Sequence, residues 1–210
     1  LRVGNPINSF YSYNHIYDAS GTPLPDGVDH NGDGIVDLQD IYEDINADGK
    51  INEDDLVIKD SPEPSVTLGL TSNLSWRNWS LAATFRATFG NWIYNNVSSA
   101  NGYYDRLYDF GLNNIHESAF TSTNFTNRQL KSDFYLENGS YMKLDNITLS
   151  YQFNTKKIFE SLSVFATASN IVTLSGYSGM DPELALHSNG IDNNLYPAAF
   201  TILAGVNANF

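Results

Sequence analysis

The chain has 210 residues, enough for one domain of good size, and carries a formal net charge of −13. It contains no cysteine, which excludes a disulfide framework and thiolate chemistry. No run of about 18 apolar residues occurs, so no membrane-spanning helix is predicted, while 13 Tyr and 12 Phe favour β structure.

Acidic residues are concentrated in one segment. Residues 26–55 hold 11 of the 24 acidic residues and a single base, Lys50. This distribution predicts a local cation site. It disfavours nucleic-acid binding through this surface, because phosphate contacts need Lys and Arg side chains.

Alternation of apolar and polar residues with a period of two predicts six strands. They span residues 7–17, 65–76, 79–89, 141–153, 162–174 and 196–210, of which the first has the weakest alternation. Only Arg77 and Asn78 separate the second strand from the third, which indicates a two-residue hairpin. The two halves of the fourth strand are out of step, so a β-bulge is predicted near Asp145 and Asn146.

The last predicted strand has one apolar face, which consists of Phe200, Ile202, Ala204, Val206, Ala208 and Phe210. Apart from Leu203, the opposite face carries only small or polar residues: Thr201, Gly205, Asn207 and Asn209. Transmembrane barrel strands show this pattern, because lipid lies outside and a polar lumen inside. A strand of a soluble sandwich alternates too, so the connections must decide between them.

Short and long connections alternate along the chain, the long ones being residues 18–64, 90–140 and 175–195. Outer-membrane barrels alternate in this way, with short periplasmic turns and long extracellular loops. We therefore expect a barrel strand at 1–17, an acidic extracellular loop at 18–64, and C-terminal barrel strands with further extracellular loops at 65–210. Six strands are too few to close a membrane barrel, which needs about eight, so we also expect strands that precede Leu1.

Two calcium-type loops follow one another in the acidic segment. Residues 29–40 read DHNGDGIVDLQD and residues 44–55 read DINADGKINEDD, and both fit the pattern D-x-N-x-D-G. Calcium takes hard oxygen ligands, from side chains and from the backbone carbonyl at loop position 7. The predicted metal ligands are Asp29, Asn31, Asp33, Ile35, Asp37 and Asp40 in the first loop, and Asp44, Asn46, Asp48, Lys50 and Asp55 in the second.

The two loops differ from ordinary EF-hands. Position 12 is Asp in both, where a bidentate Glu is usual, so the ligand is shorter and a lower affinity is expected. The loops start fifteen residues apart, which is too close for two full helix pairs. The alternatives are a solvated acidic loop and a structural calcium staple in an extracellular loop, and the tandem repetition favours calcium.

Four segments together resemble the C-terminal part of SusC-like TonB-dependent transporters of the Bacteroidetes outer membrane. They are residues 44–95, starting DINADGKINEDD, residues 136–153, LENGSYMKLDNITLSYQF, residues 168–183, ASNIVTLSGYSGMDPE, and residues 193–210, NNLYPAAFTILAGVNANF. They occur in the order of the family and cover nearly all of residues 44–210.

The resemblance implies an all-β fold, the C-terminal part of a large antiparallel barrel of about 22 strands with a plug inside. It implies energised import of a large nutrient, a glycan or a peptide, in the bacterial cell outer membrane, with a SusD-like surface lipoprotein as a lid. The plug and the segment that contacts the TonB complex would lie upstream of this chain. The doubled calcium loop departs from the single loop expected in the family.

Aromatic residues crowd the connection after the third predicted strand. Aromatic rings can stack on sugar rings or on peptide side chains, so the predicted ligand-binding residues are Trp92, Tyr94, Tyr103 and Tyr104, with Tyr108 beside them. Packing within the loop and anchoring at the membrane interface is the alternative, and it is favoured.

No catalytic function is predicted. The four histidines lie far apart without ligand spacing, at His15, His30, His116 and His187, and no nucleophile-elbow, zinc or phosphate-loop motif occurs. The competing class is a secreted calcium-binding β-sandwich, such as a carbohydrate-binding module. Strand length, alternating loop lengths and the terminal aromatic Phe210 favour the transporter barrel.

Overall fold

The computed structural model describes residues 4–109, 111, 113–155 and 159–209. The chain divides into two compact units. The loop unit comprises residues 1–63, 91–138 and 177–195, and the sheet unit comprises residues 64–90, 139–176 and 196–210. Among the described residues, no helix has the length and apolar character that crossing a membrane requires.

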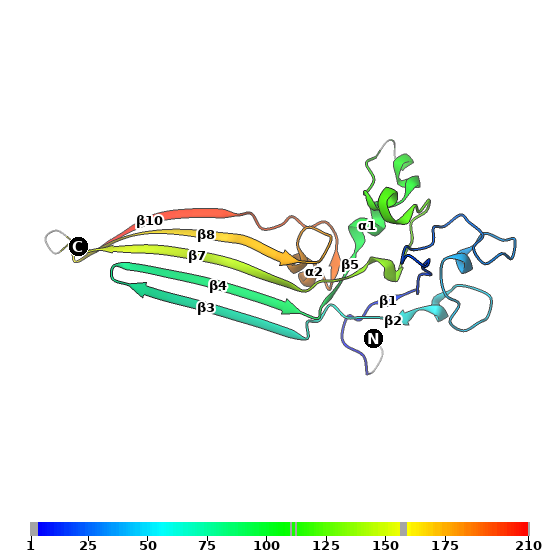
Figure 1. The fold of residues 1–210 in the computed structure, drawn as a ribbon, viewed down its shortest axis with the longest axis horizontal. Helices are drawn as coiled ribbons and strands as arrows, with labels where there is room; N and C mark the ends of the chain where they lie inside the picture. The colour runs from blue at the N-terminus through cyan, green and yellow to red at the C-terminus, as the bar shows by residue number, and fades with distance from the viewer. Residues whose placement is uncertain (1–3, 110, 112, 156–158, 210) are drawn as a thin grey trace. The chain divides into compact units, whose positions relative to one another are not determined.

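The sheet unit is one antiparallel sheet, in which the described residues form five strands in the order β10-β8-β7-β4-β3 (Figure 1). The strands are β3 (Val66–Trp76), β4 (Trp79–Phe89), β7 (Tyr141–Phe153), β8 (Ser161–Ser175) and β10 (Thr201–Asn209). The second to fifth predicted strands are therefore confirmed, each within one residue at both ends.

The last strand is shorter than predicted. It starts at Thr201 rather than at Tyr196. Thr201 pairs with Ser169 of β8, but the next residue of β8, Asn170, has a left-handed φ of 54° and donates its side-chain amide to the carbonyl of Ala199 at 3.0 Å, so the regular pairing ends there. Phe210, which the sequence places on the apolar face, lies outside the described residues.

The predicted hairpin and bulge are both present. Trp76 pairs with Trp79 across a two-residue turn, in which Arg77 takes a left-handed φ of 53°. Between β4 and β7 the register shifts so that Asp145 has no partner on β4. The extra residue brings the two halves of β7, which are out of step in the sequence, into register with the same neighbour.

The register gives the sheet one continuous apolar face. Typical cross-strand rows on it are Leu68, Ala87, Met142 and Leu174, and Leu70, Phe85, Leu144 and Val172. On this face Leu68, Leu81, Phe85 and Ile202 are all exposed, the last by 69%. The side chains predicted to face lipid therefore do not pack into a core within this chain.

The opposite face is mostly polar, with cross-strand rows such as Ser75, Ser80 and Ser150, and Thr71, Thr84 and Asn146. Hydroxyl groups pair across strands, as between Thr148 and Thr167 at 2.8 Å. Phe165 is an exception, and its ring lies over its partner Gly205, where a Cβ would come within 2.5 Å of the ring. One apolar and one polar face is the arrangement that a barrel wall between lipid and a wet lumen requires.

The hairpin end of the apolar face is aromatic. Trp76, Trp79 and Tyr151 form one row across three strands. The rings of Trp79 and Tyr151 lie 4.8 Å apart, and the guanidinium of Arg77 lies 4.9 Å from the ring of Trp76. Amphipathic aromatic rings favour the interface between hydrocarbon and water, so this row suits a membrane boundary.

The loop unit consists of short elements. Its strands are β1 (Tyr11–Ser12), β2 (Val57–Ile58), β5 (Trp92–Asn95), β6 (Leu136–Asn138) and β9 (Ile191–Asp192). Its helices are α1 (Asn96–Asn101), α2 (Pro182–His187), the 3₁₀ turns η1 (Leu38–Asp40), η2 (Glu53–Asp55), η3 (Tyr104–Tyr108) and η5 (Asp133–Tyr135), and the π-helical turn η4 (Ala119–Thr123). β1 pairs with β2, and β5 pairs with β6 and β9.

The predicted barrel strand over residues 7–17 is wrong. Only β1 forms there, followed by isolated bridges from Tyr13, His15 and Tyr17 to other parts of the loop unit. The chain is extended, so its side chains alternate, but its partners are loop segments rather than the sheet. Alternation of apolar and polar residues indicates that the backbone is extended, but it does not show which other segment the extended chain pairs with.

The core of the loop unit is largely aromatic. The ring of His15 lies 5.2 Å from Tyr42 and 5.3 Å from Phe125, and Phe134 lies 5.2 Å from Tyr135. Phe125 and Tyr135 are almost completely buried. The segment around His15 and the connections 18–64 and 90–140 therefore share this aromatic core, while Tyr177 and Ala185 of the third connection pack with Ile93.

Candidate functional site

The first calcium-type loop is held by hydrogen bonds from its own backbone. The carboxylate of Asp29 accepts from the N–H of Gly32 at 2.6 Å and of Gly34 at 3.0 Å. The side chain of Asn31 accepts from the N–H of Asp33 at 2.9 Å. Gly34 takes a φ of 86°, which explains glycine at position 6 of the pattern.

The second loop repeats this geometry. The carboxylate of Asp44 accepts from the N–H of Gly49 at 2.7 Å, and Asn46 accepts from Asp48 at 2.9 Å. Asp48 accepts in turn from Lys50 at 2.9 Å. The two stretches are thus folded alike, as the repeated pattern predicts.

The aspartates at position 12 close both loops. Asp40 accepts from the N–H of His30 at 2.7 Å and of Asp37 at 2.9 Å, and Asp55 accepts from Asn52 at 2.8 Å. Both carboxylates are buried. These backbone donors hold the pKa of both carboxyl groups below its usual range, so they are charged at neutral pH.

Asn52 was not among the predicted ligands. It caps η2 by accepting from Asp54, as Asp37 caps η1 by accepting from Gln39. Asn52 lies fifteen residues after Asp37, the same offset that separates the two loops, so the repeat alone could have identified Asn52 as the equivalent capping position. In the described part of the chain, no three or more His, Asp or Glu side chains form a group that could hold a metal ion by themselves.

The four aromatic residues predicted to bind ligand have different neighbours. Tyr94 packs against Tyr135 at 6.0 Å, and Tyr104 packs against Phe120 at 5.6 Å. Each tyrosine hydroxyl donates a hydrogen bond within the loop unit, from Tyr94 to Ser99, from Tyr103 to Asp109 and from Tyr104 to Asn124. Burial raises the pKa of Tyr94. None of these residues, nor Trp92, lines the cavity described next.

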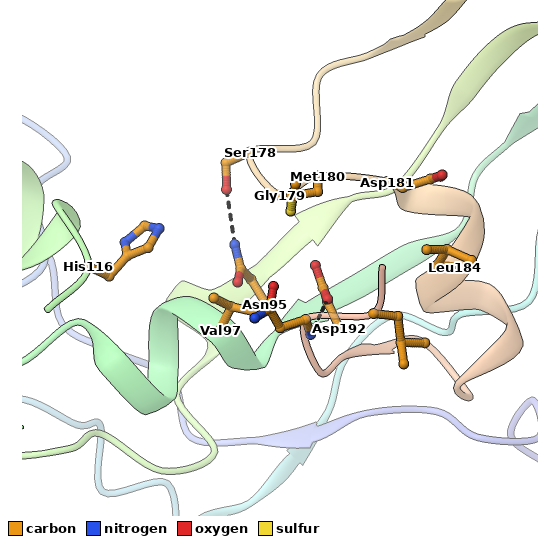
Figure 2. A pocket seen from close by; sticks show the side chains of 11 residues that line it. Asn95, Val97, His116, Ser178, Gly179, Met180, Asp181, Leu184 and Asp192 are labelled. Atoms are coloured by element: carbon orange, nitrogen blue, oxygen red, sulfur yellow. Dashed lines mark hydrogen bonds between the residues drawn. The ribbon is translucent and has the colours of Figure 1, made fainter. Parts of the chain in front are cut away.

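The loop unit contains a cavity of about 290 Å³ between α1, α2 and the end of β9 (Figure 2). Its lining residues are Asn95, Val97, His116, Ser178, Gly179, Met180, Asp181, Leu184, Asp192, Asn194 and Leu195. Two carboxylates and several neutral polar groups share this lining with aliphatic side chains. It includes neither Lys nor Arg, and no Phe, Tyr or Trp.

A hydrogen-bonded network organises one wall of the cavity. The side-chain amide of Asn95 donates to Glu137 at 2.9 Å and to the hydroxyl of Ser178 at 3.0 Å, and the second bond is drawn in Figure 2. Ser178 donates to Glu137 at 2.7 Å, and Asn95 also accepts from the N–H of Ser98 as the cap of α1. Asn95 is 2% exposed, and its polar atoms are satisfied by this network.

Asp192 forms another wall and is 8% exposed. Its carboxylate accepts from the hydroxyl of Tyr177 at 2.7 Å and from the N–H of Asn194 at 2.8 Å. Burial and this carboxylate raise the pKa of Tyr177, so its hydroxyl remains a donor. The sequence did not single out the cavity residues, because they come from separate segments that only the fold brings together.

The chain was compared with known proteins. No family model matches it. It is 31% identical to TonB-dependent receptor SusC of Bacteroides thetaiotaomicron, over the whole of this chain and 20% of that protein. It is 25% identical to TonB-dependent receptor P3 of Formosa agariphila, again over the whole chain and 23% of that protein. The chain thus spans about a fifth of the length of these relatives.

Solved structures share the fold. The RagAB peptide transporter matches with a TM-score of 0.68 and 21% identity, over 96% of this chain and 22% of the matched chain. The "closed-closed" state of the RagAB peptide importer matches with a TM-score of 0.66 and 22% identity, over 96% of this chain and 23% of that chain. Both comparisons concern a part of a larger protein.

The matches show that this chain is similar to one part of a much longer TonB-dependent receptor, and the solved structures show that it shares the fold of that part. More closely, it is a segment similar to SusC and other TonB-dependent receptors along its full length. The resemblance to SusC-like transporters and the predicted outer-membrane localisation are confirmed. The two relatives are named receptors rather than enzymes.

Proposed function

We propose that this chain is part of the barrel wall and extracellular loops of a SusC-like TonB-dependent transporter that imports a glycan or a peptide. The observation that carries the proposal is the sheet unit, whose exposed apolar face runs across all five described strands opposite a polar face. A wall between lipid and an aqueous lumen needs these two faces. A secreted sandwich, the alternative, would bury its apolar face between sheets, and it is not favoured.

The edges of the sheet support a larger barrel. Within the described residues β3 and β10 each have a neighbour on one side only. Unpaired backbone groups are costly in lipid, so both edges need further strands. We propose that other parts of the protein supply them, to complete a barrel of about 22 strands around a plug, as the family resemblance implies.

The partners proposed are a SusD-like surface lipoprotein, which would meet the loop unit, and the TonB complex, which would act through a part of the protein outside this chain. SusC is named a TonB-dependent receptor, and RagAB is named a peptide importer. The second name supports a peptide substrate, while the family resemblance implies either a glycan or a peptide. The chain itself would bind and conduct rather than catalyse.

Calcium is proposed as a structural ion of the acidic loops. The residues fit it: each loop offers Asp, Asn and Asp at positions 1, 3 and 5, a backbone carbonyl at position 7 and an Asp at position 12. Both loops have the turn that this donor set needs, with Gly34 and Gly49 at positive φ. In the first loop the ion would be held by Asp29, Asn31, Asp33, Asp40 and the carbonyl of Ile35. In the second loop it would be held by the residues fifteen positions later in the sequence. Bound calcium would neutralise part of the clustered negative charge.

The test uses the full-length protein in its native bacterium. Removing it should abolish growth on one glycan or peptide source, and restoring it should recover growth and uptake. The protein should appear in the outer-membrane fraction and require detergent for extraction. Recovery in the soluble fraction, or unchanged growth on every nutrient after deletion, would contradict the proposal.

A further inference from the structure

We infer that the cavity of the loop unit binds an ammonium group on an aliphatic stem, such as the N-terminus or a lysine side chain of a peptide. The inference rests on the proposed import function and selects, within it, a peptide over a glycan for this cavity. Its lining and one buried carboxylate carry the argument.

Asp192 is the central observation. The side chain lines the cavity and is 8% exposed, and among the described residues its carboxylate accepts hydrogen bonds from two neutral groups, the hydroxyl of Tyr177 and the N–H of Asn194. In the described part of the chain, no Lys, Arg or His side chain forms an ion pair with Asp192. Burying a carboxylate is costly unless an opposite charge compensates it, so the site is suited to a cation brought by the ligand.

The other residues of the lining restrict the chemical type of cation that the cavity can bind. Asp181 adds a second carboxylate, and the lining contains neither Lys nor Arg. Val97, Leu184 and Leu195 offer aliphatic surface for a hydrocarbon stem. A metal ion is disfavoured, because the described residues include no group of three or more His, Asp or Glu side chains that could hold one, and the lining offers only two carboxylates.

The lining also disfavours a sugar ring. No aromatic side chain lines the cavity, so a pyranose would have no flat surface on which to stack. The aromatic residues of the adjacent connection, Tyr94 and Tyr104, have their hydroxyls bonded within the unit.

The cavity leads from the surface to the carboxylate. Met180, which lines it, is 71% exposed, whereas Asp192 is buried. Figure 2 shows both side chains around the same space, with Asn95 and Ser178 on the wall between α1 and the segment before α2. A flexible Met at the exposed end can adapt to different stems.

The test measures peptide binding to the full-length protein in detergent by calorimetry. The probes are trialanine, with an N-terminal ammonium; N-acetyl-Ala-Lys-Ala-amide, with only a lysine ammonium; and N-acetyl-trialanine-amide, with neither. Asp192→Asn preserves the shape and removes the charge. It should weaken binding of at least one ammonium probe by about tenfold or more, the loss expected for a charge-assisted hydrogen bond. Which probe loses affinity distinguishes the two sources of the ammonium.

Two further variants complete the design. Glu63→Gln makes the same charge change at an exposed residue that does not line the cavity, and it should leave binding unchanged. Met180→Trp narrows the exposed end without disturbing a buried residue, so it should weaken binding even if Asp192→Asn misfolds. Both variants must retain the circular dichroism spectrum of the unaltered protein.

The inference is overturned if no ammonium probe binds at millimolar concentration. It is also overturned if folded Asp192→Asn, or folded Met180→Trp, binds both ammonium probes as the unaltered protein does, or if maltotriose competes for the same cavity. Nutrient uptake by the unaltered protein shows whether the proposed import function holds, independently of whether the cavity binds an ammonium group. Nutrient uptake with no effect of these variants refutes only the assignment of the cavity, whereas loss of outer-membrane location refutes the function.

Discussion

Asp145 and Arg86 form a paired charge across β4 and β7, at the point where the register shifts. The guanidinium of Arg86 donates from Nε and Nη2 to the two oxygens of the Asp145 carboxylate, the second bond being 2.8 Å long. Asp145 is the residue that the bulge leaves without a partner on β4. The bulge therefore directs a carboxylate onto the cation of the neighbouring strand, with the two-pronged geometry in which Arg binds carboxylates most strongly.

The first prediction concerns this pair. Asp145→Ala should lower the free energy of unfolding by about 0.5–1 kcal/mol, because it removes the charged acceptor of a guanidinium that is 44% exposed and therefore partly screened by water. Arg86→Met should have a similar effect, and the double variant should cost less than the sum of the two. Reversible urea unfolding of the full-length protein in lipid vesicles measures all three. Strictly additive losses would show that the two side chains are not coupled.

The second prediction concerns the two faces of β3. Leu70 and Thr71 are consecutive, so their side chains lie on opposite faces. Leu70→Arg places a charge on the exposed apolar face and should lower stability by about 2–4 kcal/mol if the residue lies near the bilayer midplane. Thr71→Arg makes a similar change on the polar face and should cost less. Unfolding in vesicles measures both, and an equal loss for the two variants would contradict a lipid-facing apolar side.

The sequence predicted the sheet well because its signals are local. Period-two alternation and a two-residue turn located β3 and β4, and the phase change inside β7 located the bulge. The strand over 7–17 failed because alternation also occurs in an extended loop segment. The start of β10 was placed too early because the left-handed conformation of Asn170 on the partner strand, where the pairing ends, leaves no trace in the alternation of β10 itself.

The loop unit was less predictable because its contacts are not local. The calcium-type loops follow a short motif, so the sequence located both of them, and the structure gives Gly34 and Gly49 of the motif the positive φ of a sharp turn. The cavity requires Asn95 of one long connection to meet Ser178 and Asp192 of another, more than 80 residues further along the chain. No spacing rule in a single sequence connects these positions.

The third prediction concerns calcium. Asp33→Ala and Asp48→Ala should each lower calcium affinity, because each removes one charged ligand from one loop. Asp105→Ala, at an exposed residue outside both loops, is the control. Calorimetry of the full-length protein with calcium chloride measures affinity, and urea unfolding tests the barrel, which should be unaffected. Absence of binding at millimolar calcium would refute the proposed ion.

The fourth prediction concerns pH. His15 is buried, with Nε2 3.0 Å from the carbonyl oxygen of Leu24 and Nδ1 3.1 Å from the hydroxyl of Ser132. Burial lowers its pKa, although the Leu24 carbonyl and the charges of Asp133 and Asp26 act in the opposite direction. The folded pKa is thus below the unfolded value of about 6.5. The stabilisation is complete above the unfolded value and is lost as the pH falls towards the folded value.

Hydrogen exchange of loop-unit amides should therefore be faster at pH 5.5 than at pH 7.5, after correction for intrinsic rates. His15→Gln should reduce this pH dependence, since the titrating group is removed. His187→Gln, at an exposed residue of α2, should leave it unchanged. An identical pH dependence in His15→Gln and the unaltered protein would exclude His15 as the cause.

The last prediction concerns the proposed lipoprotein partner. Tyr108 and Phe120 are large side chains of the loop unit that are 76% and 60% exposed. Exposed aromatic side chains are frequent energetic centres of protein interfaces, because they bury a large area on binding. Tyr108→Asp and Phe120→Asp should therefore reduce copurification of the SusD-like lipoprotein under gentle extraction. Tyr104 packs on Phe120, so Phe120→Asp also needs an unchanged circular dichroism spectrum. Glu117→Gln, at an exposed polar residue of the same connection, is the control and should retain the partner. Undiminished copurification by both aspartate variants would place the partner on another surface of the protein.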